Sequence, residues 1–566
     1  MMTLIILITA LISGAVSCAA DSGTPPVQTV GVDFRANLVV LPDGAWEVYK
    51  AYKETDDFYI LMRSRSTDSG HTWSTDEALK TMEGDGWAGA VSLLDRDGEV
   101  HLFFMRWRNK EGRKPAVDRF IDIWHIRSSG HRNRWSNLQR IFAGYVGSIQ
   151  NAIQLRGGRI ILPFAYWVGD SPSAPPTGSN ITTTVFSDDG GETWQQSSAE
   201  LTAPCYPDYN GNNYGAVEPV IIELADGQVW MLVRTQTGFL YESFSPDGDT
   251  WSTPAPSRFR SSTSPAYLLR LPDKRIALFW NNCEMPPRHN GAGVYGGRDQ
   301  MHAAISDDEG ATWYGFREVY LDPTRNETPP KRGDRGTAYP HAVATLDGHI
   351  ALVTGQGQGR RGLVIVDPAW LSASYHEDDF SSGLDGWNVF KAFGPAKGWW
   401  RDRLQGPQLI DHPDKPGRRV LHVRRPDKYA GDGAVWNFPA GQTGRLTVTL
   451  MLRQGFHGGS IALTDRFFNP TDDNGESEAL FVLPLGDDYS LPGGYELDPG
   501  TWYTLTLEWN VDARHCNVLV DGEEVSWLKM LNETVNGASY VRFRSGADEV
   551  DIAGMLIESV KADVKR

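Results

Sequence analysis

The sequence predicts an all-β fold: a six-bladed β-propeller followed by a β-sandwich of the jelly-roll type. Two observations carry this prediction, an eight-residue motif that recurs about every 60 residues and six tight turns that fall out of phase with it. The 59 glycines and 33 prolines among 566 residues also suit short strands joined by many turns.

The recurring motif has the form Ser-x-Asp-x-Gly-x-Thr-Trp. Clear copies begin at Ser66, Ser187 and Ser306, a shortened copy begins at Ser245, and a worn copy begins at Ser128. In such a turn, Asp can accept hydrogen bonds from the backbone, Gly supplies unusual backbone dihedrals, and Trp fills the space between strands. We therefore expect these residues to be structural and not catalytic.

The six tight turns separate pairs of apolar runs and predict β-hairpins. They lie at 41–44, 96–99, 156–159, 225–228, 272–275 and 346–349, and most contain Asp-Gly or Gly-Gly, which tolerate the positive φ of a tight hairpin. A unit of about 60 residues with one hairpin and one motif has the size of a four-stranded sheet, and repeats of this length indicate a propeller. Residues 31–374 are thus predicted to hold six blades. A β-solenoid, the alternative, would need shorter rungs and no hairpins.

The charge and the N-terminus predict where the protein acts. Acidic residues outnumber basic ones 71 to 54, for a net charge of −17, which argues against a general nucleic-acid binder. Leu4 to Val16 is an apolar run that ends in small residues, so residues 1–22 are predicted to be a secretory signal, with an uncleaved anchor as the alternative. A lipoprotein-type lipid on Cys18 is the only membrane attachment that we expect after cleavage. The protein is predicted to be secreted or held at the cell surface.

On these motifs, the sequence resembles the sialidase (neuraminidase) superfamily, in which the eight-residue motif is called the Asp box or BNR repeat and marks a six-bladed propeller. The resemblance covers about 340 residues. It implies a retaining exo-glycosidase that needs no cofactor and releases terminal sialic acid from glycans.

The resemblance also implies a cluster of three arginines that binds the carboxylate of sialic acid. A guanidinium can bind a carboxylate with two parallel hydrogen bonds, whereas Lys offers a point charge. Arg35 stands where the family has its first arginine, although the Ile and Pro that follow it there are replaced. Arg234 follows Glu218 by sixteen residues, and Arg298 precedes Ser306 by eight, as in the family. Without the resemblance, Glu218 and Arg234 could equally form a structural ion pair.

Tyr339 matches the nucleophile of the family, because it lies eight residues before Asp347 in an Asp-Gly hairpin. A neutral phenol avoids the repulsion that a carboxylate would meet at an anomeric centre that already bears a carboxylate, and sialidases are a known exception to the two-carboxylate scheme. A phenol has an ordinary pKa of about 10 and needs a base to activate it, the role implied for Glu218. A lone Tyr beside a strand is otherwise a packing residue.

The acid that protonates the leaving oxygen is implied to come from the loop between the first two strands. That loop offers Asp57, which we prefer, and Asp56, although adjacent acids on a loop are most often solvated.

The family's glutamate after the nucleophile is missing from the stretch at 351–361. A different acidic sugar, cleaved by hydrolysis or elimination, is therefore the second hypothesis. Further cationic candidates, with a solvated surface role as the alternative, are Arg332, Arg335, His341, Arg360 and Arg361.

Residues 375–566 contain alternating strand-like runs that predict a β-sandwich. Part of this region resembles the concanavalin-like and laminin-G jelly rolls. It could bind glycans through exposed aromatics such as Trp399, Trp400 and Phe467, or it could simply pack on the propeller. No metal-ligand cluster or phosphate-binding loop is evident, so neither a metal nor a cofactor is expected. A propeller and sandwich that bind glycans without catalysis is the third hypothesis.

Overall fold

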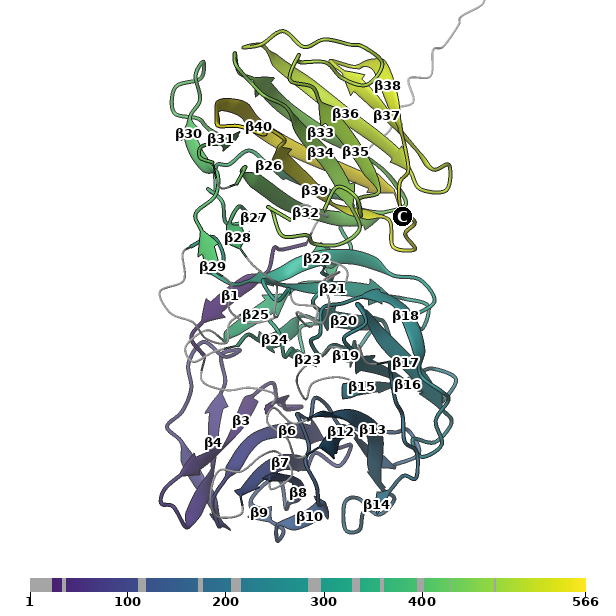
Figure 1. Ribbon diagram of the computed structural model, residues 1–566. Coiled ribbons are helices and arrows are strands. Elements are labelled where there is room, and N and C mark those ends of the chain that lie inside the picture. The colour runs from purple at the N-terminus through teal and green to yellow at the C-terminus, as the bar shows by residue number, and fades with distance from the viewer. Residues whose placement is uncertain are drawn as a thin grey trace, which may run out of the picture.

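The computed structural model describes residues 23–32, 37–109, 119–171, 177–204, 215–283, 297–327, 336–356, 361–393, 402–428, 430–472 and 475–565. Within these residues the chain forms forty strands and one short helix, α1 (Pro368–Leu371). The prediction of an all-β chain is confirmed. No helix in this part of the chain is long and apolar enough to span a membrane. Figure 1 shows two bodies of strands, one before and one after α1.

The first body consists, over its described residues, of six antiparallel sheets, here called sheets 1 to 6, in which chain neighbours pair in sequence order. Sheet 1 contains β2 (Leu38–Val40), β3 (Trp46–Lys53), β4 (Phe58–Ser66) and β5 (Glu77–Glu83). Sheet 2 contains β6 (Trp87–Leu94), β7 (Val100–Asn109), β8 (Arg119–Ser129) and β10 (Gln139–Phe142), with β9 (Arg134–Trp135) paired to β8. Sheet 3 contains β11 (Ile153–Gln154), β12 (Ile160–Ser171), β13 (Thr177–Ser187) and β14 (Gln195–Gln196).

Sheets 4 and 5 repeat the pattern, and sheet 6 joins the two ends of the body. Sheet 4 contains β15 (Val217–Glu223), β16 (Val229–Arg234), β17 (Phe239–Ser245) and β18 (Ala255–Arg260). Sheet 5 contains β19 (Tyr267–Arg270), β20 (Ile276–Trp280), β21 (Gln300–Ser306) and β22 (Tyr314–Leu321). Sheet 6 contains β23 (His341–Ala344), β24 (Ile350–Thr354), β25 (Gly362–Val366) and, from the start of the described chain, β1 (Val27–Val30).

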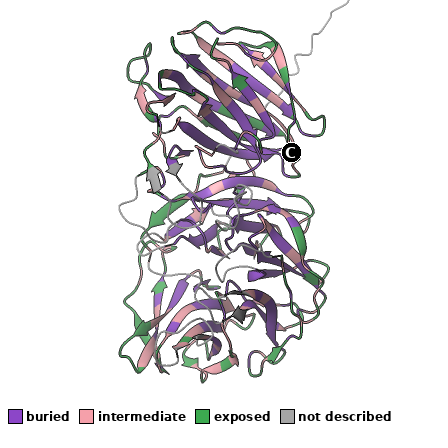
Figure 2. Ribbon diagram, in the orientation of Figure 1, coloured by how far each residue is buried: buried purple, intermediate pink, exposed green. Residues whose placement is uncertain are grey.

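Hydrophobic clusters join each sheet to the next. Buried side chains of sheet 1 pack on sheet 2, those of sheet 2 on sheet 3, and so on to sheet 6. A further cluster, which includes Leu38, Trp46 and Val353, joins sheet 6 back to sheet 1. Each sheet therefore packs on the next and the sixth packs on the first, and the apolar cores lie between them. In Figure 2 the buried residues follow the strands, and exposed residues gather at turns and strand ends.

The Asp boxes are turns that their own side chains hold together. In the first box, Ser66 Oγ donates to Asp68 Oδ1 at 2.8 Å, and the Gly70 and Thr72 amides donate to the Ser66 hydroxyl and the Asp68 carboxylate. The Trp73 indole N–H donates to the Gly70 carbonyl. The serine-to-aspartate and threonine-to-aspartate bonds recur in the boxes that begin at Ser187, Ser245 and Ser306. Through these contacts the Asp-box residues stabilise their own turns, which is the structural role that the sequence predicts for them.

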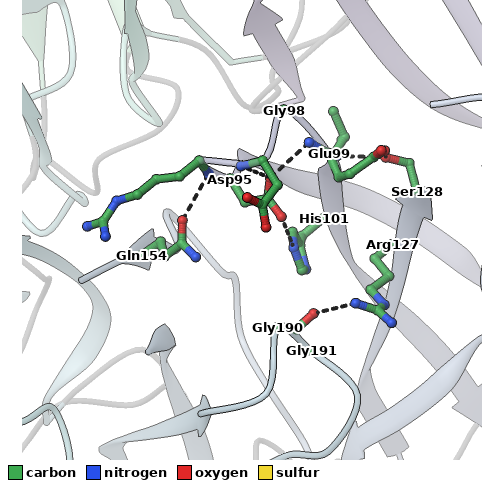
Figure 3. A network of polar contacts seen from close by, with 12 residues as sticks. Asp95, Gly98, Glu99, His101, Arg127, Ser128, Gln154, Gly190 and Gly191 are labelled. Carbon is green, nitrogen blue, oxygen red and sulfur yellow. Dashed lines mark hydrogen bonds and ion pairs between the residues drawn. The ribbon is translucent and has the colours of Figure 1, made fainter. Parts of the chain in front are cut away.

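The worn box at Ser128 lacks the aspartate, and Glu99 from the neighbouring hairpin takes its place (Figure 3). Ser128 Oγ donates to Glu99 Oε2 at 2.6 Å, and the amides of His131 and Arg132 donate to the same carboxylate. Burial by itself would raise the pKa of Glu99, but these hydrogen bonds lower it below its usual value. The preceding residue, Arg127, donates to the Gly190 carbonyl in the box of sheet 3.

The second body contains two large antiparallel sheets with a shared core that includes Trp387, Trp436 and Trp509. The larger sheet has the order β30 (Gln408–Asp411), β31 (Arg419–Arg425), β40 (Asp551–Lys565), β33 (Thr443–Leu452), β36 (Trp502–Asn510), β37 (His515–Val520) and β38 (Glu523–Lys529), with β26 (Tyr375–Asp378) paired to β40. The smaller has the order β27 (Trp387–Asn388), β32 (Gly433–Gly441), β39 (Ala538–Ser545), β34 (Gly459–Thr464) and β35 (Phe481–Leu485). A short ribbon pairs β28 (Lys391–Phe393) with β29 (Asp402–Leu404).

The two bodies meet through a buried polar network beside sheet 5. The Tyr540 hydroxyl lies 2.5 Å from His302 Nε2 and donates to Glu318 Oε1 at 2.7 Å. The Asn388 amide lies 3.4 Å from the same carboxylate oxygen. Burial raises the pKa of Glu318 to about 7 and lowers that of His302 to about 3. At neutral pH this junction therefore contains a neutral imidazole.

Phe467 also lies in this junction, where it packs with Cys283, Phe390 and Tyr540. Its side chain is fully buried, so the prediction that it forms an exposed stacking platform is wrong. Burying this apolar ring in the contact between the two bodies is more favourable in free energy than leaving it exposed to water. Trp399 and Trp400, the other two candidates, lie outside the described residues, as do residues 1–22 with Cys18.

We expect stability to depend on pH through Glu318. Its pKa is raised in the folded chain, so between about pH 4.5 and pH 7 the folded state retains a proton that the unfolded chain has released. The free energy of unfolding should therefore fall as pH rises through this window, by roughly 3 kcal/mol from this group. Denaturant unfolding across the window should show that Glu318→Gln removes the fall. Glu523→Gln, which changes an exposed carboxylate, is the control, and the same pH dependence in both variants would contradict the assignment.

Candidate active site

A cavity of about 450 Å³ lies where the inner edges of sheets 2, 3, 4 and 6 meet. Its lining contains both apolar and aromatic side chains and hydrogen-bonding and charged groups. The lining residues are Ala88, Gly89, Ala90, Val91, Met105, Trp107, Ile121, Tyr145, Gly147, Ser148, Ile149, Gln150, Asn180, Glu218, Tyr339, Val353, Gly355, Gln356 and Arg361. Within the described lining, Glu218 is the only carboxylate.

Glu218 reaches the cavity because strand β15 is irregular at this point. Val217 pairs with Arg234, but the next paired residue is Val220, so Glu218 and Pro219 form a bulge. Glu218 has φ of +48°, in the left-handed region that a residue with a Cβ adopts at some cost. Proline has no N–H to give to the ladder, which suits a bulge. The bulge turns the carboxylate out of the regular alternation of the strand.

Tyr339 has the same local arrangement on sheet 6. It lies just before β23, is followed by Pro340, and has φ of +65°. Glu218 and Tyr339 are therefore both left-handed residues that precede a proline, one within β15 and the other just before β23. Such strain persists only where the surroundings fix it, and it is concentrated at functional sites.

Arg234, the last residue of β16, joins these two residues. Its Nη1 donates to Glu218 Oε2 at 2.5 Å and lies 3.5 Å from the Tyr339 hydroxyl. The Tyr339 hydroxyl is also 3.5 Å from Glu218 Oε1. Burial by itself would lower the pKa of Arg234, but the Glu218 carboxylate and Tyr339 raise it above its usual value. The tyrosine hydroxyl thus lies between a buried cation and a buried carboxylate, within reach of a proton acceptor.

Arg298, which precedes β21, lies on the other side of the tyrosine. The centre of its guanidinium is 5.6 Å from the Tyr339 ring centroid, and its side chain is 7% exposed. The chain before Tyr339 approaches it closely, since the Thr337 amide donates to the Arg298 carbonyl at 2.6 Å. Gly336 makes this approach possible: it has φ of +115°, and a Cβ there would lie 2.3 Å from the Arg298 carbonyl oxygen.

Four of the predicted site residues are therefore close together: Glu218, Arg234, Arg298 and Tyr339. Arg35 lies outside the described residues. Asp56 and Asp57 lie at the tip of the β3–β4 hairpin, are exposed, and do not belong to the described lining of the cavity. Asp56 forms an ion pair with Lys53 at 2.6 Å, and this contact lowers its pKa.

The additional cationic candidates separate into different environments. Arg361 lines the cavity. His341 is buried, its Nε2 faces the Leu38 carbonyl, and burial lowers its pKa to about 4. Its imidazole is therefore neutral at pH 7, so His341 is not a cationic group of the site. Its ring packs against Tyr267 between sheets, so it is not solvated either. Arg332, Arg335 and Arg360 lie outside the described residues.

The family comparison supplies the identification. The BNR repeat-like domain family matches residues 45–352, more than half of the chain. The chain belongs to this family. The matched residues of the BNR repeat-like domain include the Asp boxes and the four clustered side chains.

Other comparisons are more distant. A sialidase from Trypanosoma rangeli, solved with 2,3-difluorosialic acid as a covalent intermediate, has 13% identity and a TM-score of 0.40, over 94% of this chain and 91% of that one. A protein of unknown function from Dyadobacter fermentans has 17% identity and a TM-score of 0.43, over 60% of this chain and 98% of that one. No curated protein matches the sequence significantly.

Sequence reasoning missed several residues that shape the site. The missed residues that line the cavity are Trp107, Tyr145, Asn180 and Gln356. Thr263 contacts both arginines. Nothing in their sequence surroundings distinguishes these residues from packing residues. The described residues contain no group of three or more His, Cys, Asp or Glu side chains that could hold a metal ion.

The left-handed backbone at Tyr339 predicts an unusual order of stabilities. Both Tyr339→Gly and Tyr339→Ala remove the ring, but only glycine adopts φ of +65° without steric strain. We expect the free energy of unfolding of the glycine variant to be about 1 kcal/mol higher than that of the alanine variant, so the glycine variant is the more stable. This order is the reverse of the usual one in regular strands. Thermal unfolding of the two variants tests this, and greater stability of the alanine variant would contradict the strain.

Proposed function

We propose that this protein is a retaining exo-sialidase, a glycoside hydrolase that releases terminal sialic acid from glycoconjugates. The observation that carries the proposal is the meeting of Glu218, Arg234, Arg298 and Tyr339 from sheets 4, 5 and 6 beside one cavity. We also propose that the six sheets are the blades of a propeller and that the second body is a lectin-like sandwich. Export through residues 1–22, with or without a lipid on Cys18, would place the enzyme outside the cell.

The arginines would bind the carboxylate of the sugar. Two buried guanidinium groups offer positive charge and hydrogen bonds of fixed direction, and so they stabilise a carboxylate better than water does. Arg35, as the third member, would complete the set. This binding would place the anomeric carbon over the Tyr339 hydroxyl, so positioning supplies part of the rate enhancement.

In the first step, the Tyr339 oxygen would bond to the anomeric carbon as the glycosidic C–O bond breaks. Glu218 would take the phenolic proton, and an aspartic acid would give a proton to the leaving oxygen. In the second step, water would replace the tyrosine, giving its proton to that aspartate while Tyr339 regains its proton from Glu218. Two displacements at one carbon retain its configuration.

Of the two candidate acids, Asp57 suits this role better. A general acid needs a pKa near the working pH, whereas the ion pair with Lys53 lowers the pKa of Asp56.

A second candidate function keeps the pocket but changes the sugar. Gln356 and Arg361 border the cavity, and neither supplies the acid expected there by resemblance. A uronic acid or a different nonulosonic acid, cleaved by hydrolysis or elimination, would fit a pocket changed in this way. The exposure of Asp56 and Asp57 equally favours a third possibility, glycan binding without turnover.

Hydrolysis of a fluorogenic aryl sialoside tests the proposal. We expect the wild-type protein to release sialic acid and Tyr339→Phe to lose at least about 100-fold in kcat, because phenylalanine cannot form the bond to the sugar. Tyr267→Phe is the matched control, since Tyr267 is a buried tyrosine outside the described lining of the cavity. An inactive wild type, or equal activity of the two variants, would rule out the mechanism. Turnover of a uronide alone would favour the second candidate, and binding without turnover the third.

A further inference from the structure

Thr263 contacts both arginines of the site. It lies in the segment between β18 and β19 and is 4% exposed. Its hydroxyl oxygen accepts a hydrogen bond from Arg234 Nε at 3.0 Å, and its carbonyl oxygen accepts one from Arg298 Nη2 at 2.6 Å. One residue therefore bridges two guanidinium groups that belong to sheets 4 and 5.

The segment that carries Thr263 is itself held on both sides. The Ser262 amide donates to the Asn281 carbonyl at 3.2 Å, and Ser264 Oγ donates to Asn281 Oδ1 at 2.7 Å. The Asn281 amide group in turn donates to Thr337 Oγ1 at 3.0 Å, two residues before Tyr339. Through these contacts Thr263 has a fixed position relative to the tyrosine as well as to the arginines.

Such a bridge addresses a physical difficulty in any site that binds one carboxylate with two arginines. Two guanidinium cations repel each other, and each long side chain loses rotamer entropy when it is ordered. If that ordering occurs only on binding, it reduces the affinity for the ligand. Thr263 offers a neutral oxygen acceptor to each guanidinium group, so it fixes both groups without adding to the negative charge of Glu218, whereas a second carboxylate in its place would compete with the ligand.

The contacts of Arg234 leave one group for a ligand. Its Nε bonds to Thr263 and its Nη1 to Glu218. Among the residues that the structure describes, no hydrogen bond involves its Nη2. Nη2 is therefore the nitrogen of Arg234 that the contacts with Thr263 and Glu218 leave for a ligand carboxylate.

We propose that Thr263 is a positioning residue that aligns Arg234 and Arg298 for a single carboxylate of the substrate. The inference rests on the proposed function, because it assumes that these arginines bind a carboxylate. It goes beyond that function by assigning the alignment to a neutral residue that does not itself touch the sugar.

The test compares Thr263→Val with Thr263→Ser. Valine keeps the shape and the backbone carbonyl but removes the hydroxyl, so Arg234 Nε loses its acceptor, whereas serine restores the hydroxyl. The hydrogen bond that is lost is made to a charged group and orients it, so we expect KM for the aryl sialoside to rise about 10-fold in the valine variant. The value of kcat should change little, because the carboxylate is bound in both ground and transition states. The serine variant should keep a KM near that of the wild type.

Two further variants make the comparison robust. Ser257→Ala removes another buried hydroxyl of sheet 4, one that donates to the Leu240 carbonyl and contacts neither arginine, and it should leave KM unchanged. Thr263→Ala removes the hydroxyl without placing a methyl group against the guanidinium, and it replaces the valine variant if that protein does not fold.

Binding measurements separate this inference from the proposed function. Calorimetry with 2,3-didehydro-N-acetylneuraminic acid and with its methyl ester compares a ligand that has a carboxylate with one that does not. We expect the valine variant to lose about 10-fold in affinity for the acid and much less for the ester. If the wild type binds the acid no better than the ester, the proposed carboxylate site is wrong. If the wild type prefers the acid but the valine variant weakens neither ligand, or both equally, the role of Thr263 is overturned.

Discussion

The buried ion pair between Glu218 and Arg234 is the interaction on which the rest of the site depends. Both side chains are almost fully buried, and a buried charge is tolerated only when its partner and its remaining hydrogen bonds are in place. The bulge in β15 turns Glu218 toward Arg234, and Thr263 satisfies the Nε group of the arginine. Tyr339 then lies against both charges. The pair therefore fixes the position of the tyrosine hydroxyl in addition to balancing its own charges.

The arrangement of sheets explains how such a site forms from distant parts of the chain. Hydrophobic clusters join each sheet to the next and the sixth sheet to the first, so they hold the strands that carry the site residues at fixed positions. Glu218 and Tyr339 both occupy left-handed positions before a proline, so similar local geometry on sheets 4 and 6 turns a side chain toward the same cavity. The second body contacts sheet 5 through the network of His302, Tyr540 and Glu318.

The features that the sequence predicts well are those that depend on local chemistry. The Asp boxes and the Asp-Gly turns indicated an all-β chain because their hydrogen bonds are made within a few residues. The proximity of Glu218 and Arg234 could be predicted because they belong to one hairpin. Contacts between sheets could not be, since nothing around Thr263 indicates that two arginines meet it. His341 and Phe467 were misjudged for the same reason, because their burial depends on distant partners.

We propose that one carboxylate of the substrate is bound by Arg234 and Arg298 beside the Tyr339 hydroxyl. A crystal structure of the protein with 2,3-didehydro-N-acetylneuraminic acid would test this proposal. We expect the ligand in the cavity, with its carboxylate within about 4 Å of both guanidinium groups and C2 of its ring next to the tyrosine oxygen. A ligand bound at a different place, or one whose carboxylate meets neither arginine, would contradict it.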